Sequence, residues 1–170
     1  MAAMTGVVAW LTGLPSSGKT TLARAIAAEL DHHGEHAVVL DSDELRAAFD
    51  PPLGYDDDSR VHLYLTLARL AASIARQGHI VLVPATAHRR AFRDAARAIA
   101  PAFVEIFVDT PLDECRRRDT KGLYAANAPR APGAGVAYEP PLAPDHVVQP
   151  GDHAAPATIA HALVHLLHRA

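Results

Sequence analysis

Residues 13–20 read Gly-Leu-Pro-Ser-Ser-Gly-Lys-Thr and come just after the short apolar run Val7–Leu11. The pattern G-x-x-x-x-G-K-[ST] forms a phosphate-binding turn when it lies between a strand and a helix. The apolar run predicts a buried strand of a parallel sheet. From Thr20 to Leu30 the apolar side chains recur at helical spacing, which predicts a helix. The chain is therefore constrained to open with a strand, an anion-binding turn and a helix.

The chemistry of this turn follows from its residue types. Gly13 and Gly18 allow a tight backbone whose N–H groups point inward at phosphate oxygens, and the helix that follows adds its positive dipole end. We expect Lys19 to reach the β- and γ-phosphates of ATP and Thr20 to offer its hydroxyl to Mg²⁺. A chance glycine-rich turn is the other interpretation, and the flanking strand and helix argue against it. The candidate ATP-binding residues are Gly13, Leu14, Pro15, Ser16, Ser17, Gly18, Lys19, Thr20 and Thr21.

Strand and helix patterns alternate along the rest of the chain. Short apolar runs predict strands, and longer stretches with periodic apolar residues predict helices. This alternation indicates a three-layer α/β/α sandwich of the P-loop NTPase type, with a mainly parallel sheet. The predicted strands span residues 37–40, 79–83, 103–108 and 146–148, and the predicted helices span 59–77 (with Ser59 as N-cap), 89–100, 111–118 and 156–168.

Size and composition narrow the functional classes. The length of 170 residues predicts one domain over residues 1–170. Residues 119–144 are rich in Gly, Pro and Ala, and we interpret them as a lid. A net charge of −3 disfavours a nucleic-acid partner, and no apolar run is long enough to span a membrane. The single Cys115 excludes an internal disulfide and fits a cytoplasmic location. The absence of an N-K-x-D motif argues against a GTPase.

Six stretches, taken in order, resemble motifs of the adenylylsulfate kinase family. The first contains the phosphate-binding turn, and the others resemble the family's L-D-G-D-x-x-R, L-G-F, F-V-D-T-P-L, R-D-P-K-G-L-Y and P-Y-E-x-P motifs. Together the matches cover about residues 7–150, and any motif after the first is weak by itself. In this sequence they are residues 8–23, 40–46, 53–55 (with Arg60), 107–112 (with Cys115), 118–124 and 138–141.

The resemblance implies transfer of the γ-phosphate of ATP to the 3′-hydroxyl of adenosine 5′-phosphosulfate. Asp43 matches an aspartate near the attacking hydroxyl and the Mg²⁺, so with Lys19 it is the candidate catalytic pair; a helix cap is its alternative role. Arg46 and Arg60 match arginines that grip the phosphosulfate, or they are solvated helix residues. Further candidates are Arg118, which faces either the ATP phosphates or water, the lid lysine Lys121, Tyr55 toward the adenine, and Thr86 and Leu123 in the acceptor site.

Five positions depart from the family pattern, and we expect all five in the acceptor site. Leu63 stands where the family has an asparagine, and Leu65 and Thr66 where it has arginines. Ala87 replaces a serine, and Ala131 replaces a phenylalanine that stacks on the adenine. Stacking on a base is worth about 1–3 kcal/mol, so these changes predict an altered acceptor site.

Three functions therefore stay open. The favoured one is phosphorylation of adenosine 5′-phosphosulfate, a small-molecule acceptor. The second is a divergent P-loop kinase acting on another nucleoside or small-metabolite hydroxyl, and the third is a non-catalytic nucleotide-binding module. The apolar stripe of the last helix is explained equally by packing on the sheet or by a homodimer face; its residues are Ile159, Leu163, Leu166 and Leu167.

Overall fold

Strand β1 (Val7–Thr12) is the central strand, and all six of its residues are buried. It pairs in parallel with β3 (Ile80–Pro84) on one side and with β4 (Phe103–Val108) on the other. β2 (Ala37–Val39) extends the sheet next to β3, and β7 (His146–Val148) extends it next to β4, again in parallel. The five-stranded parallel sheet therefore has the order β2-β3-β1-β4-β7. The computed structural model describes residues 5–125 and 131–169.

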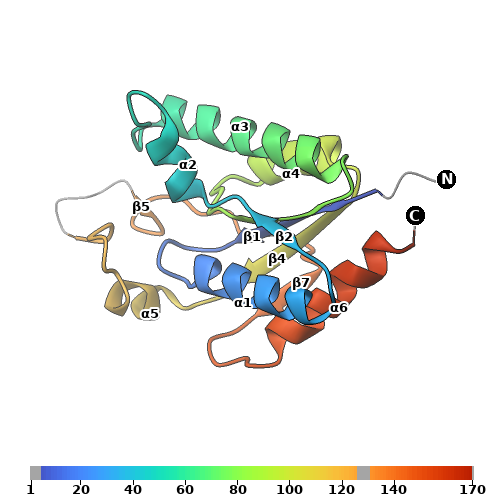
Figure 1. Ribbon diagram of the computed structural model, residues 1–170. Coiled ribbons are helices and arrows are strands. Elements are labelled where there is room, and N and C mark those ends of the chain that lie inside the picture. Colours follow the sequence, from blue (N-terminus) through green and yellow to red (C-terminus); the bar gives the residue numbers. More distant parts are fainter. Residues whose placement is uncertain (1–4, 126–130, 170) are drawn as a thin grey trace.

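Helices cover both faces of the sheet, as Figure 1 shows. Helices α1 (Lys19–His32) and α6 (Ala155–Leu167) lie on one face, and α3 (Asp57–Ala75) and α4 (Arg90–Ile99) lie on the other. The predicted three-layer α/β/α sandwich is thus confirmed. Three short elements complete the fold: α2 (Ser42–Ala48), α5 (Leu112–Arg117) and a two-stranded sheet of β5 (Ala131–Pro132) and β6 (Gly135–Val136).

The side-chain alternation of β1 creates two hydrophobic cores. Val7, Ala9 and Leu11 point toward α1 and α6, whereas Val8 and Trp10 point toward α3 and α4. Successive strand residues face opposite sides of a sheet, so a continuous apolar run is required where helices cover both faces. This explains why Val7–Leu11 shows no polar alternation.

The apolar stripe of α6 is part of the first core. Ile159, Leu163 and Leu167 are 2% exposed or less and belong to the same cluster as Leu30 of α1, whereas Leu166 is 36% exposed. Packing within one chain therefore accounts for the stripe, which removes the argument for a homodimer from this helix. Within the described residues, no helix is long and apolar enough to cross a membrane.

The structure corrects the predicted start of α3. Asp56, not Ser59, is the N-cap, because its carboxylate accepts the Ser59 backbone N–H at 2.9 Å and the Ser59 hydroxyl at 2.7 Å. Both residue types cap helices, and Asp is at least as favourable as Ser at this position. The chain also forms α2 directly after β2, a helix for which no range was predicted.

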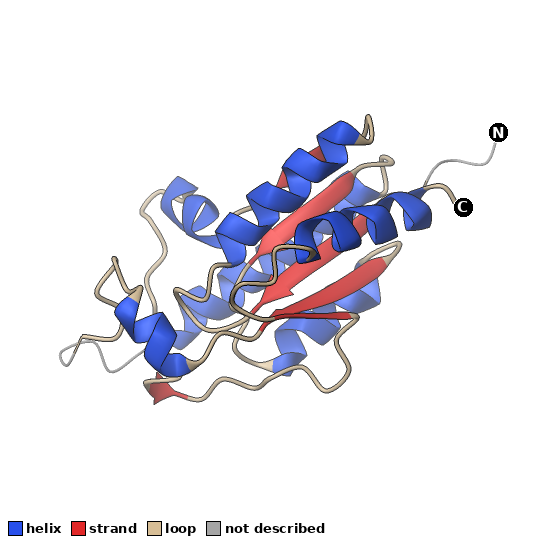
Figure 2. Cartoon of the chain, turned by 90° about the horizontal axis from the view of Figure 1, so that it is seen from below, coloured by secondary structure: helices blue, strands red, loops and turns tan. Residues whose placement is uncertain are grey.

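All five strands of the main sheet are parallel, so their carboxyl ends meet at one edge. The segments that follow β1, β2 and β3 begin there, and described residues of the connection between α5 and β7 lie at the same edge, among them Lys121, Leu123, Ala131 and Pro132 (Figure 2). Ligands of open α/β sheets bind outside the carboxyl ends of the strands. The fold therefore places the phosphate-binding turn, the acidic segment after β2 and the predicted lid around one cavity.

Candidate active site

The phosphate-binding turn requires glycine at two positions. Gly13 has φ 154°, and a Cβ there would lie 2.5 Å from the carbonyl oxygen of Val108. Gly18, at φ 101°, caps the N-terminus of α1 in a left-handed conformation. An L side chain is excluded at the first position by the close backbone and strained at the second, so the turn keeps its backbone open to an anion.

Lys19 folds back over this turn. Its ammonium donates to the carbonyl oxygens of Gly13 at 3.1 Å and Leu14 at 2.7 Å. Burial lowers the pKa of Lys19 to about 8, and the negative charge of Asp43 offsets this only in part. A buried ammonium that is held by neutral carbonyls gains more from an anion, so the lysine is poised to exchange these partners for phosphate oxygens.

Thr20 makes its strongest contact with a residue that the sequence did not single out. Its hydroxyl donates to the Asp41 carboxylate at 2.6 Å, and that carboxylate also accepts the backbone N–H of Asp43 at 2.8 Å as the N-cap of α2. Asp41, and not Asp43, is therefore the cap that the alternative interpretation assigned to Asp43. The signal was present in the sequence, because Asp41 comes directly after a strand and precedes a helix-compatible segment.

The donor set beside the turn fits Mg²⁺. Hydroxyl and carboxylate oxygens are the ligands this ion prefers, and it is usually held by one or two carboxylates together with substrate phosphates. Thr20, Asp41 and Asp43 supply such oxygens next to the turn. Within residues 5–125 and 131–169, no three His, Cys, Asp or Glu side chains gather to bind a metal ion without such help.

Asp43 faces the cavity and is paired with Lys121 across it. The two side chains form an ion pair between the segment after β2 and the predicted lid, and both are about half exposed. Burial acts to lower the pKa of Lys121, but the contact with Asp43 outweighs it and the pKa is raised. The predicted catalytic carboxylate and the predicted lid lysine are thus in direct contact.

Most of the candidate residues line one cavity of about 770 Å³. It is lined by every candidate acceptor-binding residue, by Arg118 and by most of the phosphate-binding turn. Gly13, Leu14 and Ser17 do not line it. The lining residues are Pro15, Ser16, Gly18, Lys19, Thr20, Thr21, Ser42, Asp43, Arg46, Tyr55, Arg60, Tyr64, Pro84, Thr86, Arg118, Thr120, Lys121, Leu123, Ala131 and Pro132.

Two buried arginines give part of the cavity wall a positive charge. Arg46 and Arg60 are both buried, at 8% and 3% exposure. The Arg46 guanidinium lies 4.2 Å from the centre of the Tyr55 ring and donates to the Gly54 carbonyl oxygen. Its Nε is buried and has no partner among the described residues. A buried cation with a free donor at a cavity wall favours an anionic ligand there.

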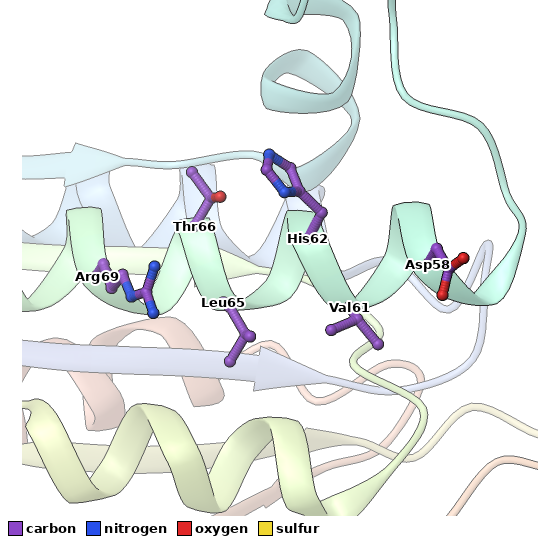
Figure 3. A pocket seen from close by; sticks show the side chains of 6 residues that line it. All are labelled: Asp58, Val61, His62, Leu65, Thr66 and Arg69. Atoms are coloured by element: carbon purple, nitrogen blue, oxygen red, sulfur yellow. The ribbon is translucent and has the colours of Figure 1, made fainter.

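Not all of the five departures from the family pattern belong to this cavity. Leu65 and Thr66 line a separate groove of about 260 Å³ on the outer face of α3, with Val61, His62 and Arg69 (Figure 3). The expectation that they alter the acceptor site was wrong. The helical period explains why: residues three and four after Arg60 share its face, whereas residues five and six after it do not.

The other three departures from the family pattern also lie in different parts of the structure. Leu63 and Ala87 are fully buried in the second core and do not line the cavity, so the expectation was wrong for them too. Ala131 does line it and is 6% exposed. The change that directly alters the cavity wall is therefore the one at Ala131. Tyr64, which sequence reasoning missed, also lines the wall.

The predicted lid contacts the phosphate-binding turn. The Tyr124 hydroxyl donates to the Pro15 carbonyl oxygen at 2.7 Å, and Asp119 accepts the backbone N–H groups of Leu123 and Tyr124 at 3.0 and 2.8 Å. Gly133 lies against Leu14, where a Cβ would be 2.8 Å from its side chain. The predicted lid spans residues 119–144, of which 126–130 lie outside the described residues.

Cys115 is buried on α5, and its thiol donates to the Thr110 carbonyl oxygen at 3.6 Å. Burial raises the pKa of this thiol. A thiol held in its protonated form is a poor nucleophile, so the chemistry of the cavity is that of Lys19, Asp43 and the arginines.

The parallel sheet with this strand order, together with the glycine-lysine turn at the start of α1, defines a P-loop nucleotide-binding protein. Known proteins narrow the class. The family model "Adenylylsulphate kinase" matches residues 5–149. The chain is 38% identical to an adenylyl-sulfate kinase of Paraburkholderia xenovorans, an alignment that covers 88% of this chain and 86% of the relative. The chain belongs to the adenylylsulphate kinase family.

Other relatives agree with this assignment. The chain is 41% identical to the bifunctional enzyme NodQ of Azospirillum brasilense over 95% of its own length, and it spans 27% of that longer relative. The structure of the Mycobacterium tuberculosis APS kinase CysC in complex with AMPPNP and APS superposes with a TM-score of 0.82 at 35% identity. That alignment covers 96% of this chain and 98% of the other.

Proposed function

We propose that this protein transfers the γ-phosphate of ATP to the 3′-hydroxyl of adenosine 5′-phosphosulfate, giving ADP and 3′-phosphoadenosine 5′-phosphosulfate. The observation that carries the proposal is the single cavity that joins the phosphate-binding turn, with Lys19, to Asp43 and the buried arginines Arg46 and Arg60. Adenylyl-sulfate kinases at 37–38% identity and the APS-bound relative support the same acceptor. Neither of the two other candidate functions has comparable support.

The donor half of the cavity binds ATP. The backbone N–H groups of the turn and the N-terminus of α1 receive the phosphates, Lys19 leaves the carbonyls of Gly13 and Leu14 for phosphate oxygens, and Arg118 faces the same anions. Thr20, with Asp41 and Asp43, would hold Mg²⁺. When bound, this ion neutralises charge that develops on the transferred phosphoryl group.

The acceptor half positions the attacking hydroxyl. Arg46 and Arg60 bind the phosphosulfate, and Tyr55, a residue that is 46% exposed, offers the ring face away from Arg46 to the adenine. Asp43 accepts the proton of the 3′-hydroxyl once Lys121 releases it. Phosphoryl transfer needs little covalent participation from a protein, so positioning and charge stabilisation supply most of the catalysis. Thr86 and Leu123 complete the wall around the acceptor.

A coupled assay of ADP release tests the proposal. The purified protein receives ATP and Mg²⁺ with adenosine 5′-phosphosulfate, AMP, adenosine or a small polyol, and product phosphorylation is followed by chromatography. We expect ADP release that depends on adenosine 5′-phosphosulfate and a product phosphorylated at the 3′ position. ADP release with a different acceptor would support the divergent kinase instead. Nucleotide binding without release under any acceptor would support the binding module.

Three further parts of the proposal follow from the sequence. Residues 119–144 act as a lid on a single domain, supported by the contacts of Tyr124 with Pro15 and of Lys121 with Asp43. Protection of this segment from proteolysis by an ATP analogue tests the lid. The homodimer stays a prediction, which analytical ultracentrifugation tests. A cytoplasmic location is also proposed, since the donor is ATP and the single cysteine is free.

A further inference from the structure

Tyr64 is a cavity-lining residue to which the proposed mechanism gives no role. The structure shows it on α3, one turn after Arg60, in the same wall as Arg46 and Thr86. It is 4% exposed, yet it is part of the lining, so only a small part of the side chain reaches the cavity. Residues four apart on a helix share a face, which explains why Arg60 and Tyr64 meet the same space.

The ring of Tyr64 is fixed from behind. Phe92 of α4 lies 4.9 Å from it between ring centres, and His88 lies 6.3 Å from it. The ring also belongs to the second hydrophobic core together with Leu67. A ring that is packed in this way does not offer its face for stacking on a base. What remains for a ligand is the hydroxyl, held in one position at no further cost in side-chain entropy.

The hydroxyl is prepared to donate. Burial raises the pKa of Tyr64, so the phenol keeps its proton, while the backbone of Ala87 acts in the opposite direction through a hydrogen bond. Among residues 5–125 and 131–169, no acceptor takes the Tyr64 proton. The O–H of this cavity-lining side chain is therefore available to a ligand.

The surroundings of the hydroxyl point to an anion. Arg46 and Arg60 act to lower the pKa of the phenol and the Asp43 carboxylate acts to raise it, so two cations and one anion lie near the hydroxyl. The Arg46 side chain is 8% exposed and its buried Nε has no partner in the described part of the chain, which is an independent sign that a ligand completes this wall. Two cations and one neutral donor on one wall match a group that carries several acceptor oxygens.

We infer that Tyr64 is an acceptor-binding residue, whose hydroxyl donates a hydrogen bond to the phosphosulfate between Arg46 and Arg60. The inference rests on the proposed function. It assigns a neutral donor to the part of α3 that lines the cavity, which is Tyr64 and not Leu63, because Leu63 is buried in the second core and does not line the cavity.

Titration calorimetry on the protein loaded with a non-hydrolysable ATP analogue tests this. The variants are Tyr64→Phe and, as matched control, Tyr138→Phe, which loses a phenol bonded to Thr12 at 2.9 Å outside the cavity. The probes are adenosine 5′-phosphosulfate and adenosine, which lacks the anionic group. We expect Tyr64→Phe to raise the Kd for the phosphosulfate by about tenfold or more, as for a lost hydrogen bond to a charged group.

The test depends on which of the three ligands loses affinity for each variant. The inference is supported if Tyr64→Phe leaves the Kd of adenosine and of the ATP analogue unchanged and Tyr138→Phe leaves all three unchanged. It is overturned if Tyr64→Phe binds the phosphosulfate as the wild type does, or if it weakens adenosine and the ATP analogue to the same degree. A wild-type protein that does not bind the phosphosulfate would overturn the proposed function itself, and the inference with it.

Discussion

His88 makes the stability of the protein depend on pH in a predictable direction. Its side chain is 2% exposed and packs against Tyr64 and Phe92, and burial together with the cations Arg60 and Arg89 lowers its pKa from 6.5 to about 4. The folded state therefore holds the neutral imidazole. The unfolded chain takes up a proton on this residue once the pH falls below about 6.5, whereas the folded protein does so only near 4.

The magnitude follows from the shift. Each pKa unit corresponds to about 1.4 kcal/mol, so a change from 6.5 to about 4 corresponds to about 3 kcal/mol of unfolding free energy. This stability is fully present above the unfolded pKa, is lost progressively between about pH 6.5 and pH 4, and changes no further below that. Such a loss is a large part of the stability of a single domain.

Urea unfolding at a series of pH values measures how the free energy of unfolding depends on pH. The free energy of unfolding of the wild type is compared with that of His88→Leu, which keeps an apolar side chain of similar size at the position. The difference between the two should change by about 3 kcal/mol from pH 7 to pH 4. His153→Leu replaces an exposed imidazole and controls for the loss of a histidine as such. Parallel curves for wild type and His88→Leu would refute the reasoning.

Three more predictions concern the cavity and its support. Because burial lowers the pKa of Lys19 to about 8, the affinity for an ATP analogue should be constant below pH 8 and fall above it; Lys19→Ala should lose both the affinity and the pH dependence in calorimetry. Asp43→Asn should lower kcat by about a hundredfold or more while circular dichroism shows an unchanged fold, and an unchanged kcat would remove Asp43 from the mechanism. Arg93 is fully buried, pairs with Glu105 at 2.8 Å and donates to two carbonyl oxygens, so Arg93→Met should cost about 3–5 kcal/mol of unfolding free energy. Arg97→Met, which removes the half-exposed partner of the same glutamate, should cost less than about 1 kcal/mol of unfolding free energy. Equal losses of unfolding free energy in Arg93→Met and Arg97→Met would contradict this prediction.

Local signals predicted the frame of the molecule well. The strand over 103–108 and the strand over 146–148 appear at the predicted bounds, because short apolar runs between turn residues leave few alternatives in a sheet covered on both faces. The phosphate-binding turn was also predictable from its motif, because Gly13 lies against the backbone of Val108 and leaves no space for a side chain. The candidates after it were predicted from a resemblance to a family, and the structure places Asp43 and Lys121 in direct contact.

What the sequence did not show depends on three-dimensional register. Sequence reasoning assigned Asp41 no role of its own, and the position of α1 decides that it receives the Thr20 hydroxyl. Leu65 and Thr66 were assigned to the acceptor site by motif position alone, although the helical period places them on the outer face of α3. Tyr64 was passed over because it follows Leu63 at a motif position, while its burial and orientation come from the packing of α3 against α4.

The pairing of Asp43 with Lys121 has a consequence for ATP that is bound alone. While the Lys121 ammonium occupies the Asp43 carboxylate, a water molecule beside the terminal phosphate finds no free carboxylate to take its proton. Only a ligand that draws the lysine away releases the aspartate for chemistry. On this view the salt bridge suppresses hydrolysis of ATP by water as long as no acceptor hydroxyl is bound.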